Sequence, residues 1–277
     1  MIETHIYESH RELKLGIKIW LEMFRELFQF RQLIGRLFLR DLSVRYKQSL
    51  LGQAWILIMP LVAIGTFMYL NHTGVLRFQE TGMPYPLYAL MGLSIWQIFA
   101  TGLNAGANSL VGSGDLITKI NFPREVLVLA SMGQSVFEFL VKMALIVICF
   151  FVFHFCPSWK IIFLPFMLLP LLLLTIGLSL LLSLANGVFR DCANIVSLFL
   201  MFVMFLTPVL YPVPLHHFFF KINVLSPLID VPRQVMAFGH IDHGLLAFQL
   251  ATCLSVLIFL VSWRIFHLVE TKIPERI

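Results

Sequence analysis

The chain has 277 residues, of which 59% are hydrophobic and only 13% are charged, and its mean hydropathy is +0.87. A soluble domain with so few charged residues lacks the polar surface that keeps it dissolved, so this composition predicts a polytopic membrane protein. The formal net charge is +5. Because the cations concentrate before the first long apolar segment and lie among hydrophobic residues, they fit the anionic inner leaflet of a membrane better than a nucleic acid.

The region before the first apolar segment contains an amphipathic pattern. Residues 11–30 place Trp20 and Phe24 on one face of a helix, and Lys14 and Lys18 on the opposite face. Such a helix is too charged to span a bilayer. Its composition predicts an interfacial helix that lies flat at the headgroup boundary of the inner leaflet, with packing against a partner protein as the alternative.

The composition of the chain changes near Gly52. Arg40, Asp41 and Arg45 precede this residue, whereas no charged residue follows it for more than twenty positions. A charge near the bilayer centre costs roughly 2.5 to 3.5 kcal/mol on insertion scales, so we expect the chain to enter the membrane here. Lys and Arg beside a span stay in the cytoplasm, which predicts that residues 1–50 are cytoplasmic and that the first span acts as the insertion signal.

Apolar segments of spanning length recur along the rest of the chain. A hydrocarbon core about 30 Å thick needs roughly 20 apolar residues in a helix, and this rule predicts six spans in a transmembrane domain of residues 51–264. An even number returns residues 265–277 to the cytoplasm, which agrees with the distribution of Lys and Arg between the loops. The predicted spans are residues 54–71, 87–108, 126–153, 161–185, 193–211 and 245–263.

Two connections between the predicted spans are longer than a turn. Residues 109–125 place Asp115 four residues before Lys119, between glycines and a proline, which favours a short helix across the cytoplasmic face. Residues 207–244 contain two apolar pieces that are each too short to cross, and prolines and charged residues interrupt them. This pattern predicts a re-entrant helical hairpin in the outer leaflet, shielded by protein.

The sequence contains no catalytic motif. It lacks a GxxxxGK[ST] phosphate loop and has no Gly-Lys dipeptide, so we do not expect the chain to bind ATP by that cradle. His240 and His243 flank Asp242, but a polar loop cap is favoured over a metal site because no carboxylate cluster lies nearby. The four cysteines lack metal-ligand spacing and are interpreted as small packing residues. No catalytic, cofactor or metal site is therefore predicted on this chain.

One pair of ionisable residues lies inside a predicted span. Glu138 and Lys142 are four residues apart with the glutamate first, so both lie on one face of a helix and each neutralises the other. Ionisable residues at this depth mark a polar interior more often than a lipid-facing surface. A structural pair is favoured over a proton relay, because relays usually contain further acids or histidines within the spans.

Aromatic residues in the first two predicted spans allow two interpretations. Trp55 and Tyr69 lie near the ends of the first span, where interfacial anchoring explains them. Trp96 and Phe99 lie in the second span, where Trp96 adjoins polar side chains that lipid does not favour. These side chains are Ser94, Gln97, Thr101 and Asn104. A water-accessible wall with aromatic rings suits a sugar polymer, because a ring offers a flat apolar surface to a pyranose, but ordinary helix packing also explains each ring.

Several motifs occur in order along the chain. The longest, RDLSVRYKQSLLGQAWILIMPL at residues 40–61, precedes and begins the first span. INFPREVLVLA, FRD, TPVLYP and LSPLIDVPRQVM follow it. Together they resemble the permease subunit of type-2 ABC exporters of polysaccharides, which include O-antigen, capsule and teichoic acid exporters. Ser226 stands before Pro227 where many relatives have asparagine, although serine also caps helices.

The resemblance implies an assembly and a role for several segments. It implies a homodimer with six spans per subunit, driven by two copies of a separate ATPase that binds ATP and Mg. Residues 11–30 are similar to the interfacial helix, residues 109–122 to the coupling helix that docks into the ATPase, and residues 213–242 to the outer gate helices. The residues implied for coupling are Asp115, Leu116 and Lys119, and those for the outer gate are Tyr211, Asp230 and Arg233.

The expected function is that of the membrane-spanning subunit of an ATP-driven exporter. Its expected substrate is a lipid-linked glycan, its expected location is the bacterial inner membrane with both termini in the cytoplasm, and its expected contacts are membrane lipid and no nucleic acid. Residues expected along the substrate path are Trp96, Phe99, Trp55 and Tyr69. A type-2 ABC permease for a small hydrophobic molecule or lipid is one alternative, and a non-transporting scaffold or passive channel is another.

Overall fold

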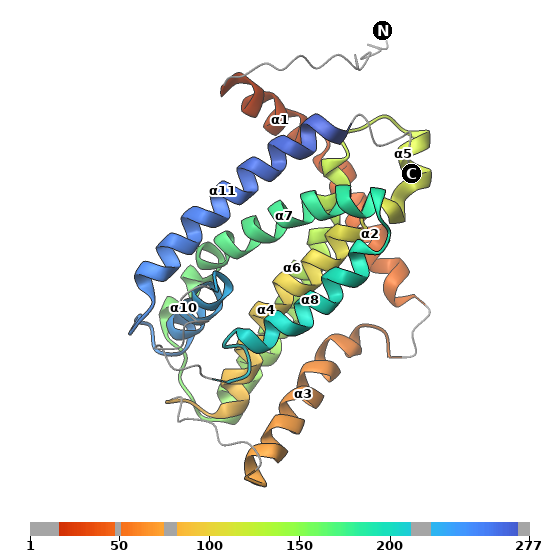
Figure 1. Cartoon of the computed structure of the whole chain (residues 1–277). Coiled ribbons are helices and arrows are strands. Elements are labelled where there is room, and N and C mark those ends of the chain that lie inside the picture. The colour runs from red at the N-terminus through yellow and green to blue at the C-terminus, as the bar shows by residue number, and fades with distance from the viewer. Residues whose placement is uncertain (1–16, 48–50, 75–81, 212–222, 271–277) are drawn as a thin grey trace.

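The computed structural model describes residues 17–47, 51–74, 82–211 and 223–270, and within these ranges all regular structure is helical. This confirms the all-α prediction. Figure 1 shows the arrangement of the helices. The α-helices are α1 (Ile17–Gln29), α2 (Arg31–Tyr46), α3 (Trp55–His72), α4 (Tyr85–Asn108), α5 (Gly114–Lys119), α6 (Glu125–Val152), α7 (Leu164–Val188), α8 (Cys192–Leu206), α10 (Leu225–Ala237) and α11 (Leu245–Val269). Short 3₁₀ helices are η1 (Gly52–Ala54), η2 (Val111–Ser113) and η3 (Trp159–Phe163).

Helix α4 lies at the centre of the fold. It packs most extensively against α6 and α7, and it also contacts α3, α8 and α10, while α11 packs on α7. Small residues let α4 and α7 approach closely, because a Cβ added at Gly106 would lie 2.4 Å from Ser179 Cβ. The Asn186 side chain donates a hydrogen bond to the Ala107 carbonyl at 3.0 Å and joins the same two helices. Packing of small residues and buried hydrogen bonds therefore hold α4 in place.

Five helical segments are long and apolar enough to cross a membrane within the described ranges. They correspond to five of the six predicted spans. The segments are Gly52–Leu70, Tyr85–Asn108, Glu125–Val152, Trp159–Val188 and Leu245–Val269. The remaining predicted span, residues 193–211, coincides with α8, which has only 15 residues. It ends early because Thr207 is extended before Pro208, a position where proline disfavours helical geometry. The count of six is therefore not confirmed.

The charged region before the first span packs on the bundle. Helix α2 contacts α6, where the Phe38 ring lies against Gly133 so closely that a Cβ on Gly133 would be 2.7 Å from it. The Arg45 guanidinium reaches Glu138, which lies near the middle of α6. The sequence predicted only a cytoplasmic region of residues 1–50 and gave no sign of this contact.

Helix α1 contains the predicted amphipathic pattern. The rings of Trp20 and Phe24 contact Trp263 of α11 at centroid distances of 5.7 and 4.9 Å. Phe24 is also largely exposed. Lys14 lies outside the described residues, and the side chain of Lys18 is likewise not described. Part of the apolar face of α1 therefore packs on α11, and part of it is exposed at the surface of the protein.

The close approach of α4 and α7 predicts that a larger side chain at their contact lowers thermal stability. Gly106→Ala is expected to lower the thermal unfolding midpoint of the purified chain, because the new Cβ requires the two helices to separate. Gly65→Ala in α3 is the matched control, since nothing lies within 4 Å of a Cβ at that position. It should leave the midpoint unchanged or raise it through better helix propensity. Equal midpoints for the two variants would contradict the packing described.

Candidate functional site

A cavity of about 660 Å³ lies beside α4. Trp96, Gln97, Thr101 and Asn104 line it, so most of the polar face predicted on the second span borders this cavity. Gln97 Oε1 is buried and accepts no hydrogen bond from the described residues. The α4 wall of the cavity is therefore neutral, polar and able to accept hydrogen bonds from a ligand.

The predicted path residues do not all lie at this cavity. Trp96 lines it, whereas Phe99 is buried in the core, with its ring centroid 5.7 Å from that of Trp96. Trp55 and Tyr69 lie on α3, where 43% and 69% of their surface is exposed. Ser94 is buried and donates a hydrogen bond to the Leu90 carbonyl at 2.6 Å. The structure thus brings only Trp96 of the four aromatic residues to the cavity wall.

Helix α2 supplies a second, charged wall of the cavity. Its lining residues include Arg40, Asp41 and Arg45. Arg40 Nε donates a hydrogen bond to Asp41 Oδ1 at 2.8 Å, which makes a local ion pair. Sequence reasoning used these residues only to place the membrane boundary and gave them no part in a site. Their position follows from the packing of α2 on α6, which no local pattern encodes.

The predicted pair Glu138 and Lys142 is confirmed and belongs to a larger group. Lys142 Nζ lies 3.6 Å from Glu138 Oε2, and its side chain is 2% exposed. Glu138 Oε1 accepts a hydrogen bond from Gln134 at 2.9 Å and lies 4.0 Å from Arg45 Nη1. One carboxylate therefore faces two cations, one from α6 and one from α2.

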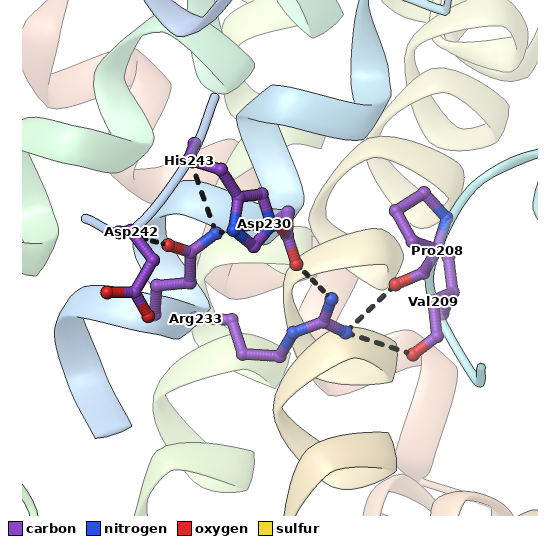
Figure 2. A network of polar contacts seen from close by, with 7 residues as sticks. Pro208, Val209, Asp230, Arg233, Asp242 and His243 are labelled. Carbon is purple, nitrogen blue, oxygen red and sulfur yellow. Dashed lines mark hydrogen bonds and ion pairs between the residues drawn. The ribbon is translucent and has the colours of Figure 1, made fainter. Parts of the chain in front are cut away.

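A second polar network lies around Arg233 of α10, whose side chain is 1% exposed (Figure 2). The guanidinium donates hydrogen bonds to the Pro208 carbonyl at 2.9 Å and to Asp230 Oδ1. It also lies over the Tyr88 ring of α4, 3.7 Å from the centroid. Arg233 thereby joins α10, α4 and the segment that follows α8. A buried charge is stable only when it is paired, and Arg233 is bonded both to Asp230 and to a backbone carbonyl.

Asp230 connects this network to the loop before α11. Asp230 Oδ2 lies 3.1 Å from His243 Nε2 and accepts a hydrogen bond from Gln234 at 2.7 Å. Burial alone would favour protonated Asp230, but the bonds from His243, Arg233 and Gln234 outweigh it and hold the pKa of Asp230 well below its usual value. The bond to Asp230 raises the pKa of His243 above its usual range. Both shifts favour ionised Asp230 beside protonated His243.

The start of α10 is fixed by a residue that the sequence analysis did not consider. Asn223 Oδ1 accepts a hydrogen bond from the Leu225 backbone N–H at 3.0 Å, and Asn223 Nδ2 donates to Thr207 Oγ1 at 2.8 Å. The capping side chain is therefore Asn223, and the Ser226 hydroxyl, considered as a cap, has no hydrogen-bond partner among the described residues. Tyr211, expected at the outer gate, donates to the Phe205 carbonyl.

The short helix expected between the second and third spans is present as α5. Asp115 and Lys119 are exposed on it, while Leu116 is half-buried against the cluster of apolar side chains that contains Phe122. Helix α5 lies at the same end of the molecule as α1 and the end of α11 (Figure 1). Helix α5 therefore exposes two charged side chains at that end and packs on the bundle through Leu116.

A buried polar cluster joins the beginning of α6 to the end of α11. His267 Nδ1 lies 2.9 Å from Glu125 Oε1 and 3.7 Å from Glu270 Oε1, and Trp263 Nε1 donates to Glu125 Oε1 at 3.1 Å. The Arg124 backbone N–H donates to Glu270 Oε2 at 3.0 Å. Sequence reasoning missed this cluster because more than a hundred residues separate its two halves.

The donor atoms of Glu125, His267 and Glu270 lie within 4.8 Å of one another, which is a set that could hold a metal ion. No such group of three includes His240 or His243 in the described part of the chain. The hydrogen bonds from Trp263 and Arg124 explain the same arrangement as a structural contact that joins α6 to α11.

The helices of spanning length, the polar cavity among them and the outward-facing short helix define an integral membrane protein of the transport class. The chain belongs to the ABC-2 type transporter family, whose family model matches residues 32–236. This match includes α4, α6 and nearly all of α2 and α10, so it covers the cavity and the contact between Arg233 and Asp230. The resemblance seen in the sequence motifs is confirmed.

Curated relatives cover most of the chain. The chain is 32% identical over 192 residues to the O-antigen export system permease protein RfbA of Myxococcus xanthus, covering 69% of this chain and 73% of the relative. It is 27% identical over 241 residues to RfbA of Klebsiella pneumoniae, covering 85% and 91%. A more distant relative is the polysialic acid transport protein KpsM of Escherichia coli, 20% identical over 236 residues.

The His243 contact predicts a pH-dependent stability. Since the pKa of folded His243 lies above the unfolded value of about 6.5, the contact stabilises the fold most below that value and is lost as the pH rises through the raised pKa. His243→Gln should therefore lower the unfolding midpoint more at pH 5.5 than at pH 9. His72→Gln, at an exposed position of α3, is the control. A His243→Gln effect that is equal at both pH values would contradict the ion pair.

Proposed function

We propose that the chain is the membrane-spanning subunit of an ATP-driven exporter that moves a lipid-linked polysaccharide across the bacterial inner membrane. The observation that carries this proposal is the cavity beside α4, which has neutral amide and hydroxyl groups next to the indole of Trp96. Sugar hydroxyls match such amides, and a pyranose face matches an aromatic ring. The names of the relatives, which refer to O-antigen export and polysialic acid transport, support the same substrate class.

The energy for export would come from a separate ATPase, in two copies, that binds ATP and Mg. The sequence of this chain contains no phosphate loop. Helix α5 is the expected docking element, with exposed Asp115 and Lys119 to meet the partner and Leu116 to transmit its movement to the bundle. In this mechanism, closure of the ATPase dimer tilts α5 and opens the path beside α4.

The polar network around Arg233 would act as the outer gate of the path. Arg233 and Asp230 hold α10 against α4 and against the segment that follows α8. Helix α10 is almost fully buried, which agrees with a protein-shielded re-entrant hairpin whose other half, in residues 212–222, lies outside the described residues. Passage of a polymer would require these contacts to separate and re-form.

The assembly would be a homodimer with six crossings per subunit and cytoplasmic termini. Helix α8 and the segment after it would make the sixth crossing, and α1 would lie at the inner leaflet. Helices α3 and α8 carry apolar side chains that are exposed in a single copy, which a second copy or lipid would cover. Exposed examples are Met59, Val62, Ile195, Leu198 and Phe202.

The rival functions fit the cavity less well. A permease for a small hydrophobic molecule would favour an apolar wall, whereas Gln97, Thr101, Asn104 and Asn108 are polar. A scaffold that does not transport would have no use for a cavity walled by charged and amide groups in its core.

The proposal predicts substrate-dependent ATP hydrolysis. The chain is co-expressed with the ATPase encoded beside it, reconstituted in nanodiscs and given a lipid-linked glycan extract from the same cells. The extract should stimulate ATP hydrolysis. Gln97→Leu should reduce the stimulation several-fold and leave the basal rate unchanged, because it removes a cavity-facing amide whose Oε1 has no partner in the described protein.

Gln249→Leu, the same substitution at an exposed position of α11, is the control and should retain full stimulation. Stimulation by small amphiphiles but not by the glycan would favour the hydrophobic-substrate rival. Failure to form a complex with the ATPase would contradict the transport mechanism.

A further inference from the structure

The charges on the α2 and α6 walls of the cavity do not balance. Arg40 and Asp41 neutralise each other through their ion pair. The third charged residue of the lining is Arg45, which lies 4.0 Å from Glu138, a carboxylate outside the lining that Lys142 also contacts. The lining residues of α4 and α8 carry no charge. Arg45 therefore has no carboxylate of its own and shares Glu138 with Lys142.

Arg45 is the cation that can meet a ligand. Its guanidinium lines the cavity and its side chain is 53% exposed, whereas Lys142 is buried against Glu138. Arg45 lies 4.0 Å from Glu138, which is beyond hydrogen-bond distance, and it donates no hydrogen bond to any part of the described chain. All five of its N–H donors therefore remain for a ligand or for water.

We propose that Arg45 forms the centre of a phosphate-binding subsite of the cavity, which takes the phosphate ester of an amphiphilic ligand. A guanidinium offers a planar pair of donors that matches two phosphate oxygens. Because Arg45 shares Glu138 with Lys142, a bound anion would complete the charge pairing of the group. The neighbouring Arg40 is paired with Asp41, so Arg45 is the source of net positive charge on this wall, and the α4 wall across the cavity is neutral.

This subsite rests on the proposed function and refines it. If the ligand is a lipid-linked glycan, the phosphate that joins lipid to sugar lies at Arg45, while hydroxyl groups of the first sugars meet Gln97, Thr101 and Asn104 across the cavity. The headgroup phosphate of an ordinary anionic phospholipid offers the same chemistry. The two sources differ in what else the site must accommodate, so a competition experiment separates them.

The test is direct binding by the full chain in nanodiscs of phosphatidylcholine, with farnesyl diphosphate as the probe and farnesol as its uncharged counterpart. Farnesyl diphosphate should bind saturably and farnesol at least tenfold more weakly. Arg45→Gln should weaken farnesyl diphosphate binding by about tenfold or more, as expected for a lost charge-assisted pair. Arg45→Lys keeps the charge without the planar fork and should have an intermediate affinity.

Arg36→Gln is the matched control, because Arg36 is exposed on the same helix and does not line the cavity. It should bind the probe as the unaltered chain does. Thermal unfolding midpoints of all variants verify that each is folded. Unchanged affinity in folded Arg45→Gln, or equal affinity for farnesol and farnesyl diphosphate, would overturn the subsite.

Nanodiscs that contain phosphatidylglycerol separate the two sources of phosphate. Competition with the probe at Arg45 would support the subsite with membrane phospholipid as its occupant, and absence of competition would support it with the substrate lipid. The binding experiment and the ATPase experiment can fail independently of each other. If farnesyl diphosphate binding depends on Arg45 but the glycan does not stimulate the ATPase, the subsite stands and the proposed function falls.

Discussion

The structure depends on the position of α4, a polar helix that is surrounded by other helices. A spanning helix with several amide and hydroxyl side chains is unfavourable in lipid, so its neighbours must cover it or give it water. Helices α6 and α7 cover two sides, and the contact of Gly106 with Ser179 shows how closely α7 approaches. The remaining side, with Gln97 and Asn104, borders the cavity. The fold therefore keeps a polar surface inside a membrane protein without exposing it to lipid.

Two charged networks lie beside different parts of this central helix, one at Tyr88 and one at the cavity that Gln97 lines. Arg233 is buried and directly bonded to Asp230, and its contacts fasten α10 to α4 and to the segment after α8. Arg45 is half-exposed and incompletely paired, and it lies on a wall of the cavity. The buried and directly bonded Arg233 favours a stable arrangement, whereas the exposed Arg45 lies beyond hydrogen-bond distance of its carboxylate and can meet a ligand. Under the proposed function, the Arg233 network would hold the path closed and the cavity would accept the ligand.

Local patterns in the sequence predicted much of the fold and part of the site. Hydrophobic segment length predicted five of the helices that are long enough to cross, and the spacing of Glu138 and Lys142 predicted their ion pair. The spacing of Gln97, Thr101 and Asn104 also predicted the polar face of α4. Contacts between distant segments were not predictable in this way. No periodicity places Arg45 beside Glu138 or joins Glu125 to His267, because tertiary packing alone creates those contacts.

The central claim is that the polar face of α4 borders a path open to water. The most direct measurement is modification of single cysteines by a membrane-impermeant thiol reagent, in a chain whose four native cysteines are replaced by serine. Asn104→Cys, at the cavity wall, should react, and a lipid-linked glycan should protect it. Ile98→Cys, in the buried core of the same helix, should not react. If Asn104→Cys is as unreactive as Ile98→Cys, the cavity is closed to water and the account is wrong.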